Sequence, residues 1–424
     1  MAARLLAAGA SLSKPADAQV ILINTCTVTS EADAKSRKAL RRSLEKAQDA
    51  VVIVCGCGAT VDPAQFEDIP GKRLVIADKE LALQKALEIL VQRDGVGLVQ
   101  RDGVGVPLFE TKSGTPTPSL CTKPTPSLCT KPTPLSIGEG FNTRVQVKVQ
   151  DGCDNSCSYC IVPQARGRAQ SMSLPLVLAE IQALMQAGAQ EIVLTGIDLG
   201  NYQDGQNSLE VLLSKALRLE GTCRFRLSSI ELPGITHELV QLIADSKGRI
   251  CAHLHVPLQS GSDAVLQAMN RRYSAADFQS KISNAREVLP QLSLTTDVIV
   301  GFPGESEEDF ALTIALSKEL LFSRMHVFRY SKRPGTPAAE LPRQLSQQAK
   351  AERSKALRRL AEELTVNDAQ KRIGTTEQVL MESAHKGRSE SYYPVQVKEK
   401  AEPGSLTALK IVGYENGQLI GVKG

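Results

Sequence analysis

The chain has 424 residues, of which 42% are hydrophobic and 23% are charged, a composition that fits two or three folded domains and argues against a largely disordered protein. The 50 Lys and Arg residues outnumber the 46 Asp and Glu residues by only four, so the charge favours an anionic partner such as RNA only mildly. Ten cysteines, most of them clustered, fit reduced thiols that hold a metal better than a secreted disulfide scaffold. Because no apolar run approaches about 18 residues, we expect a cytoplasmic protein with no membrane partner.

Residues 1–90 predict an α/β domain. Residues 18–25 and 51–54 are continuous apolar runs, typical of strands buried in a parallel sheet, and residues 30–48 between them have a helical composition. Cys26 and Cys57 follow these strands, at the edge where open α/β sheets place their ligands. Both are therefore candidate metal ligands, the alternative being small hydrophobic residues buried in a core.

A break in composition near Val91 predicts a linker over residues 91–140. Residues 91–98 are nearly repeated over 99–106, and residues 117–124 are repeated identically over 125–132. Copies this short lie far below the period of folded repeats, and their prolines are incompatible with a helix or a sheet ladder. We therefore assign no ligand role to Cys121 and Cys129, which lie inside the copies.

Strands and helices are expected to alternate over residues 141–343. The predicted strands are residues 145–150, 191–195, 224–229, 253–256, 294–300 and 325–328, with helical segments such as 174–187, 262–269 and 307–321 between them. Six such units predict a partial parallel β/α barrel whose active site lies at the carboxyl ends of the strands. Thr195, Gly196, Gln259 and Gly301 lie at or beyond these ends, which makes them candidates for contacts with a cofactor.

The first barrel strand leads into Cys153, Cys157 and Cys160, three thiols within eight residues. Thiolates suit zinc or iron–sulfur clusters, and no second CxxC pair is present to complete a structural zinc site. The spacing therefore favours a [4Fe–4S] cluster with one iron open to a small chelating molecule. The alternatives are zinc with a distant fourth ligand such as His253 or His255, which we expect instead to line the barrel, and a redox disulfide, which leaves one thiol unexplained.

A charged helical stretch over residues 344–370 leads to residues 371–424, where short β-rich runs are separated by turn signals. This spacing predicts a small β-barrel. Its scattered Lys and Arg residues can track a phosphate backbone; a purely structural barrel is the alternative.

Several of these segments resemble a known family. Cys153-x-x-x-Cys157-x-x-Cys160 resembles the signature of radical S-adenosylmethionine enzymes, and residues 150–163 with Arg166-Gly-Arg168 resemble the methylthiotransferase branch. The similarity to the tRNA threonylcarbamoyladenosine methylthiotransferases continues in segments 24–33, 194–200, 227–231, 253–262, 269–273, 297–305 and 331–337. It covers most of the chain except the linker.

The resemblance implies that the three cysteines hold a [4Fe–4S] cluster at which S-adenosylmethionine is cleaved to a radical that takes hydrogen from carbon 2 of an adenine. Thr195, Gly196, Gln259 and Gly301 become candidate contacts with S-adenosylmethionine. The implied activity is transfer of a methylthio group to N6-threonylcarbamoyladenosine beside the anticodon of tRNA. An electron donor protein and a sulfur source are implied as further partners, and the C-terminal barrel is similar to the RNA-binding TRAM domain.

In this family the N-terminal domain holds a second [4Fe–4S] cluster with three cysteines, of which Cys26 and Cys57 match two. The third, in a Gly-Cys-x-x-Asn segment, has no match, so we expect an N-terminally truncated chain whose second cluster assembles poorly, with Cys55 as an alternative ligand. The competing functions are the same chemistry on isopentenyladenosine in tRNA or on an aspartate of a ribosomal protein. A third alternative is an RNA-binding relic that has lost its sulfur cluster.

Overall fold

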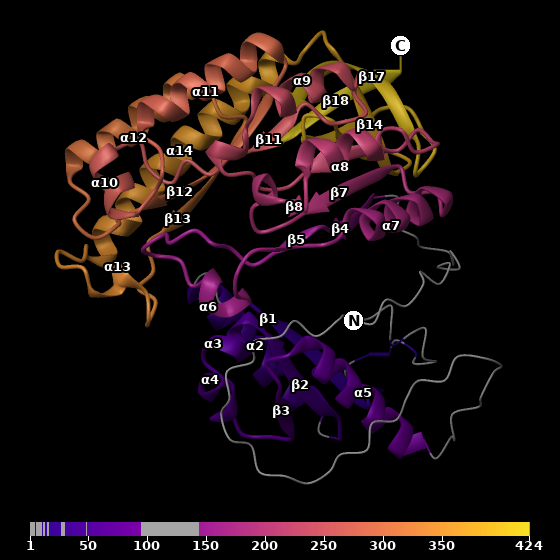
Figure 1. The fold of residues 1–424 in the computed structure, drawn as a ribbon, viewed down its shortest axis with the longest axis vertical. Coiled ribbons are helices and arrows are strands. Elements are labelled where there is room, and N and C mark those ends of the chain that lie inside the picture. The colour runs from indigo at the N-terminus through magenta and orange to yellow at the C-terminus, as the bar shows by residue number, and fades with distance from the viewer. Residues whose placement is uncertain are drawn as a thin grey trace. The chain divides into compact units, whose positions relative to one another are not determined.

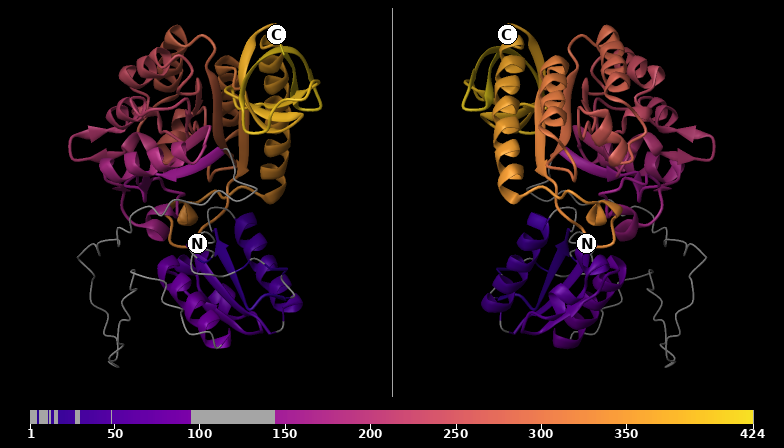
Figure 2. Two further views of the ribbon diagram at one scale, coloured as in Figure 1. Left: turned by 90° about the vertical axis from the view of Figure 1, so that its right-hand side faces the viewer. Right: turned by 90° about the vertical axis from the view of Figure 1, so that its left-hand side faces the viewer.

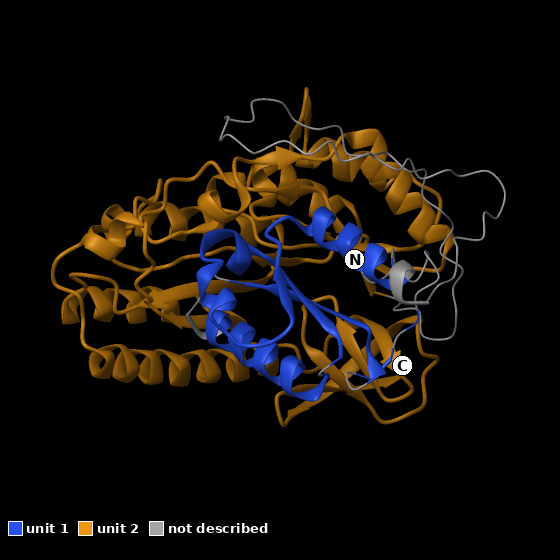
Figure 3. Cartoon of the chain, turned by 90° about the horizontal axis from the view of Figure 1, so that it is seen from below, with its two compact units in different colours: residues 1–133 blue, residues 134–424 orange. Residues whose placement is uncertain are grey.

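The computed structural model describes residues 5, 11, 13–14, 17–26, 30–47, 49–94 and 144–423 (Figure 1). Most of the predicted linker, including Cys121 and Cys129, lies outside these residues. The chain divides into two compact units, residues 1–133 and 134–424, coloured separately in Figure 3, and each is described by itself. In the described ranges, no helix combines the length and the apolar character needed to cross a membrane.

The first unit is a three-stranded parallel sheet with helices on both faces. The strands are ordered β1-β2-β3, with β1 at Val20–Thr25, β2 at Val51–Gly56 and β3 at Arg73–Val75. The helices are α2 (Ser30–Lys46), α3 (Cys57–Val61), α4 (Ala64–Glu67) and α5 (Lys79–Asp94). Val52 and Val54 pack against Leu40 of α2 and Phe66 of α4, while Ile53 packs against α5. Burial on both faces explains the continuous apolar runs of β1 and β2.

The second unit contains the predicted partial barrel. Two parallel sheets, β10-β7-β4 and β11-β12-β13, are joined by the bridges Phe225↔Ile250 and Ser229↔His255. The strands are β4 (Arg144–Lys148), β7 (Glu191–Thr195), β10 (Arg224–Leu227), β11 (His253–His255), β12 (Ser293–Val300) and β13 (Arg324–Arg329). The covering helices are α7 (Leu174–Gln186), α8 (Leu209–Ala216), α9 (His237–Asp245), α10 (Asp263–Ala268), α11 (Ala275–Val288) and α12 (Glu307–Leu320). The six-stranded partial barrel is thereby confirmed.

Short elements decorate the strand ends and loops of this unit. They are β5 (Gln150–Asp151), β6 (Gln170–Ser171), β8 (Gln203–Asp204), β9 (Asn207–Ser208), α6 (Val162–Arg166), α13 (Pro337–Glu340) and the 3-10 turns η2 (Leu199–Asn201) and η3 (Leu232–Gly234). The pair β5 and β6 is antiparallel and leads into the loop with the three cysteines.

The inner face of the barrel is polar, unlike the apolar interior of a closed eight-stranded β/α barrel. Val147, Leu194, Phe225, Leu254 and Leu294 belong to one core shared with the surrounding helices. Side chains alternate along a strand, so the intervening polar residues face the interior: Gln146, Lys148, Glu191, Thr195, Arg224, Arg226, His253, His255, Ser293, Thr295, Asp297, Arg324 and His326. A polar, partly exposed interior suits a polar substrate.

A closed five-stranded barrel follows, as predicted. Its order is β14-β15-β16-β18-β17, with β14 at Thr376–Ser383, β15 at Lys386–Ser389, β16 at Pro394–Val397, β17 at Leu406–Glu415 and β18 at Gln418–Lys423. Helix α14 (Gln347–Lys371) leads to it and lies along β12 and β13, as Figure 2 shows. Val379, Met381, Val395, Leu409 and Leu419 fill the small barrel.

The small barrel is attached at the amino-terminal ends of the large barrel's strands. Arg224 donates to the carbonyls of Gln378 (2.7 Å) and Arg388 (3.0 Å), and Arg226 donates to those of Ser389 (3.0 Å) and Glu390 (2.9 Å). The small barrel therefore lies at the amino-terminal ends of the strands, whereas the cysteine loop lies at their carboxyl ends.

Candidate functional site

The three cysteines of the second unit lie in the loop between β5 and α6, and each thiol accepts a hydrogen bond. The Asn155 amide donates to Cys153 Sγ (3.4 Å), the Val162 amide donates to Cys160 Sγ (3.4 Å), and Arg271 Nη1 donates to Cys157 Sγ (3.3 Å). Such bonds stabilise sulfur that carries negative charge and help set the potential of an iron–sulfur cluster.

The three thiols also lie close enough to affect one another. Burial raises the pKa of Cys160 to about 11, and Cys157 and Cys153 contribute to the increase. Burial likewise raises the pKa of Cys153, with Cys157 again adding to it. A raised pKa means that deprotonating these thiols costs free energy. A bound metal offsets this cost because it binds thiols in the deprotonated form. The donor set therefore fits a cluster held by three thiolates.

Gly152 and Gln150 fix the start of the cysteine loop. Gly152 has φ +70°, and a Cβ there would lie 2.0 Å from the carbonyl oxygen of Arg168. The Gln150 side chain donates to the Gly152 carbonyl (2.9 Å) and accepts from the amides of Ile197 (2.8 Å) and Asp198 (3.1 Å). One buried amide thus ties the loop to the turn after β7.

We expect Gly152→Ala to displace the cysteine loop and to lower the iron bound after anaerobic reconstitution. Alanine would add both a clash with Arg168 and the strain of a left-handed backbone, roughly 1–2 kcal/mol. The matched control is Gly167→Ala, because Gly167 has φ +75° but a Cβ there would have no neighbouring atom within 4 Å. Iron per chain separates the two effects: equal iron contents in the two variants would show that the clash is unimportant.

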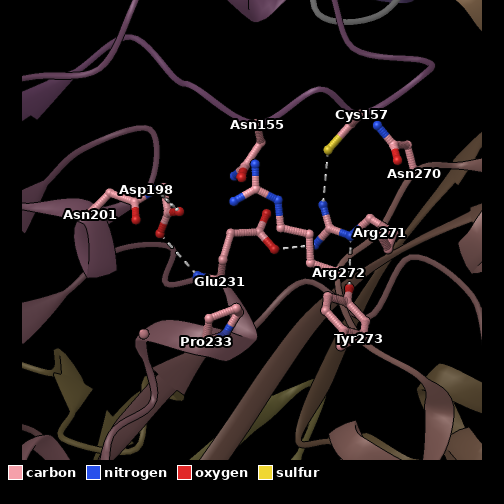
Figure 4. A pocket seen from close by; sticks show the side chains of 11 residues that line it. Asn155, Cys157, Asp198, Asn201, Glu231, Pro233, Asn270, Arg271, Arg272 and Tyr273 are labelled. Carbon is pink, nitrogen blue, oxygen red and sulfur yellow. Dashed lines mark hydrogen bonds and ion pairs between the residues drawn. The ribbon is translucent and has the colours of Figure 1, made fainter.

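A pocket opens beside Cys157, and Figure 4 shows Arg271 between this thiol and Glu231. Arg271 forms an ion pair with Glu231 and donates from Nε to Tyr273 Oη (3.0 Å). Asp198 Oδ1 accepts from the Glu231 amide (3.1 Å), and burial raises the pKa of both carboxyl groups. A guanidinium and two carboxylates thus lie beside a candidate cluster ligand, and they complement a ligand that carries both signs of charge.

Arg271 and Asp198 were not assigned as site residues from the sequence, although both lie in segments that resemble the family. Arg271 and Cys157 are 114 residues apart, and nothing in local periodicity connects them. Asp198 follows the end of β7, which was an available signal, whereas Arg271 lies in the loop between α10 and α11.

The predicted contacts with S-adenosylmethionine fall in three places, and none of them lines this pocket. Thr195 ends β7, and the Gly196 amide donates to Ser228 Oγ (3.2 Å). A Cβ at Gly196 would lie 2.9 Å from Gln150 Oε1, so these two residues lie next to the support of the cysteine loop.

Gln259 carries two features typical of a binding site. Its backbone has φ +65° although it is not glycine, and such strain is concentrated at functional positions. Its buried side-chain oxygen has no hydrogen-bond partner among the described residues. A buried acceptor without a hydrogen bond destabilises the folded protein unless a ligand or a water molecule donates to it.

Gly301 faces the opposite way, toward α14. A Cβ there would lie 2.4 Å from Lys350 Cγ, and φ is +73°. Its amide donates to Glu305 Oε2 (2.5 Å), and Glu305 is paired with Arg353 (2.6 Å). In this structure Gly301 forms a tight turn held against α14.

In the first unit, Cys26 and Cys57 leave neighbouring strands at the same edge of the sheet. Thr25 is the register partner of Gly56, and each cysteine follows one of these residues, on strands about 4.8 Å apart. Thr25 Oγ1 donates to the Cys55 carbonyl (2.7 Å) and accepts from the Ala59 amide (3.1 Å). The Cys55 side chain instead packs with Ala82 and Ala86 of α5, away from this edge, which disfavours it as the alternative ligand.

Two family models match the chain: "Radical SAM superfamily" over residues 147–316 and "Uncharacterized protein family UPF0004" over residues 1–77. The chain is 35% identical to the threonylcarbamoyladenosine tRNA methylthiotransferase MtaB of Bacillus subtilis, covering 96% of this chain and 89% of that protein. It is 34% identical to the tRNA-2-methylthio-N(6)-dimethylallyladenosine synthase of Thermodesulfovibrio yellowstonii, covering 65% of each. Among solved structures, the radical S-adenosylmethionine methyltransferase TsrM of Kitasatospora setae shares the fold, with TM-score 0.50, 16% identity and coverage of 77% of this chain and 67% of that one.

Proposed function

Because the chain belongs to the radical S-adenosylmethionine tRNA methylthiotransferase family, we propose that it transfers a methylthio group to carbon 2 of N6-threonylcarbamoyladenosine beside the anticodon of tRNA. The chain is an enzyme of the transferase class, and its cofactors are S-adenosylmethionine and a [4Fe–4S] cluster. The relative named for threonylcarbamoyladenosine matches 96% of this chain at 35% identity, and the relatives named for dimethylallyladenosine match 65% and 88% of it at 34% and 32% identity. This narrow difference in coverage and identity supports the threonylcarbamoyl substrate.

The observation that carries the proposal is the convergence of three hydrogen-bonded thiols beside a charged pocket. Cys153, Cys157 and Cys160 would hold the cluster, since their donor set fits it. Bound together, the cluster and S-adenosylmethionine supply a radical able to take hydrogen from carbon 2 of an adenine. Arg271 and Glu231 fix the position of Cys157 and present charges toward the pocket.

The amino-acid end of S-adenosylmethionine is the ligand that we assign to the pocket beside Cys157. Its carboxylate would meet the guanidinium of Arg271, and its ammonium group would meet Asp198 or Glu231. Charge-assisted hydrogen bonds of this kind are stronger than neutral ones and orient a ligand. Gln259, with its unsatisfied oxygen, remains a candidate contact.

The modified adenine would enter the polar interior of the partial barrel. Phe328, on the inner face of β13, is 38% exposed although its ring is large and apolar. Exposed aromatic rings stack on bases and contribute roughly 1–3 kcal/mol per base. We assign Phe328 as a stacking surface for the adenine.

The C-terminal barrel would contact the phosphates of the tRNA. Exposed basic side chains are spread over its surface: Lys386, Lys398, Lys400, Lys410 and Lys423. An electron donor protein and a sulfur source are further partners that the reaction requires. Cys26 and Cys57 would serve as two ligands of a second cluster that delivers sulfur.

Nucleoside mass spectrometry of tRNA tests the proposed function. A strain that lacks the gene is expected to lose the methylthio group from N6-threonylcarbamoyladenosine and to retain it on isopentenyl-modified adenosine. Restoring the gene should restore the lost nucleoside. Loss on the isopentenyl nucleoside instead would transfer the assignment to that substrate. An unchanged tRNA nucleoside pool would favour a ribosomal protein aspartate or an RNA-binding relic.

A further inference from the structure

Three potential metal ligands meet inside the partial barrel, away from the cysteine loop. His255, Asp297 and His326 lie on β11, β12 and β13, and their ligand atoms all fall within 4.8 Å of one another. His255 Nε2 and Asp297 Oδ1 are 3.3 Å apart. The cluster therefore draws one side chain from each of three neighbouring strands.

Sheet register explains why these side chains converge. His255 is the register partner of Thr295, and Asp297 is the register partner of His326. Thr295 and Asp297 are two residues apart on β12, so they point to the same face. The opposite face carries Leu254, Leu294 and Val298, which pack in the core. The three ligands are thus held on the inner face by the strands themselves.

The chemistry of this donor set is that of a divalent metal site. Two imidazole nitrogens with one carboxylate form a set typical of first-row metals such as Fe2+, and imidazole also suits Zn2+. Ligand atoms bound at about 2.1 Å lie roughly 3.0–3.4 Å apart, a spacing that His255 and Asp297 already have. His326 is exposed, and its ligand atom lies within 4.8 Å of those of the other two residues.

Thr295 holds the ring of His255 in an orientation suited to metal binding. Its hydroxyl is hydrogen-bonded to His255 Nδ1 (2.9 Å), which leaves Nε2 facing Asp297. Metal-binding histidines commonly have their second ring nitrogen fixed by such a partner. When His255 Nδ1 donates to the Thr295 hydroxyl, Nε2 carries a lone pair that faces the Asp297 carboxylate. The lone pair and the carboxylate repel each other, and a cation bound between them removes this repulsion.

We propose that His255, Asp297 and His326 bind one divalent cation of the Fe2+, Mn2+ or Zn2+ class inside the partial barrel. Three protein ligands leave coordination positions open toward the interior, where an oxygen atom of a substrate can complete the coordination. The site uses none of the cysteines, so metal binding to it is measured separately from the methylthio transfer.

Mn2+ titration of the full-length protein, after anaerobic reconstitution of iron and sulfide and with bound iron–sulfur kept in the oxidised state, tests the site. Electron paramagnetic resonance reports the free Mn2+ remaining in solution. The expected result is one bound Mn2+ per chain, displaced by Zn2+. Asp297→Asn and His326→Gln should each weaken binding by at least about 10–100-fold. The matched control is His237→Gln, because His237 is exposed at the start of α9 and outside the cluster.

Absence of Mn2+ and Zn2+ binding by the unsubstituted protein would overturn the proposal. Binding that survives both substitutions would overturn it too, because the metal would then lie elsewhere. Since His326 is exposed, the His326→Gln variant is expected to fold normally, and its circular dichroism spectrum checks this.

Discussion

Cys153→Ala is expected to abolish reductive cleavage of S-adenosylmethionine and all methylthio transfer. The cysteine loop contains three thiols, and Cys157 and Cys160 are already the other two proposed ligands, so no further thiol of the loop can replace Cys153. The Asn155 amide donates a hydrogen bond to Cys153 Sγ. Iron, acid-labile sulfide and 5′-deoxyadenosine formation in the anaerobically reconstituted protein measure the loss.

The control for this variant is Cys223→Ala, which removes a thiol buried in the main core and away from the loop. It should lower stability modestly and leave the second unit's cluster intact. Full methylthio transfer by the Cys153→Ala protein would refute the assignment of the three thiols.

Glu191→Gln is expected to destabilise the second unit by roughly 3–5 kcal/mol, since removing one partner of a buried ion pair leaves the other charges uncompensated. Glu191 is fully buried between Arg144 (3.0 Å), Arg224 (2.6 Å) and Arg226 (2.8 Å). Thermal unfolding measures the change, and Glu238→Gln on the exposed face of α9 is the control. Equal unfolding temperatures for the two variants would show that the ion pairs of Glu191 with these arginines do not stabilise the second unit.

Glu191 also makes the free energy of unfolding of the second unit depend on pH. Burial raises the pKa of Glu191, but Arg226, Arg224 and Arg144 outweigh burial and lower the pKa to about 2. An unfolded glutamate has a pKa of about 4.3. Because the folded pKa is the lower one, the stabilisation is present above about pH 4.3 and is lost as the pH falls toward 2. In the Glu191→Gln variant, the free energy of unfolding should therefore depend less on pH between about 4.3 and 2.

Apolar runs and composition were sufficient to predict the main strands and their order of occurrence. Residues 191–195 were predicted as a strand and match β7, and the predicted helix at 174–187 matches α7 within one residue. By contrast, β15 has the sequence Lys386-Gly-Arg-Ser389, which carries no apolar alternation. It is a strand because β14 and β16 on either side pair with it, and tertiary pairing of this kind overrides local propensity.

The candidate site was predictable only where its residues are adjacent in sequence. The spacing of Cys153, Cys157 and Cys160 was readable, whereas the approach of Arg271 to Cys157 depends on the closing of the barrel. Gly301 follows a strand end as predicted, yet its Cα faces Lys350 of α14. Position at a strand end identifies the correct edge of the sheet but not the direction of each residue.

The attachment of the small barrel at the amino-terminal ends of the strands sets a minimum size for the RNA. β12 has eight residues, which at about 3.3 Å each span roughly 26 Å. An RNA that touches the small barrel and also places a base at the cysteine loop must bridge at least this length. A single nucleoside cannot reach both places, so an RNA that contacts both must contain several nucleotides.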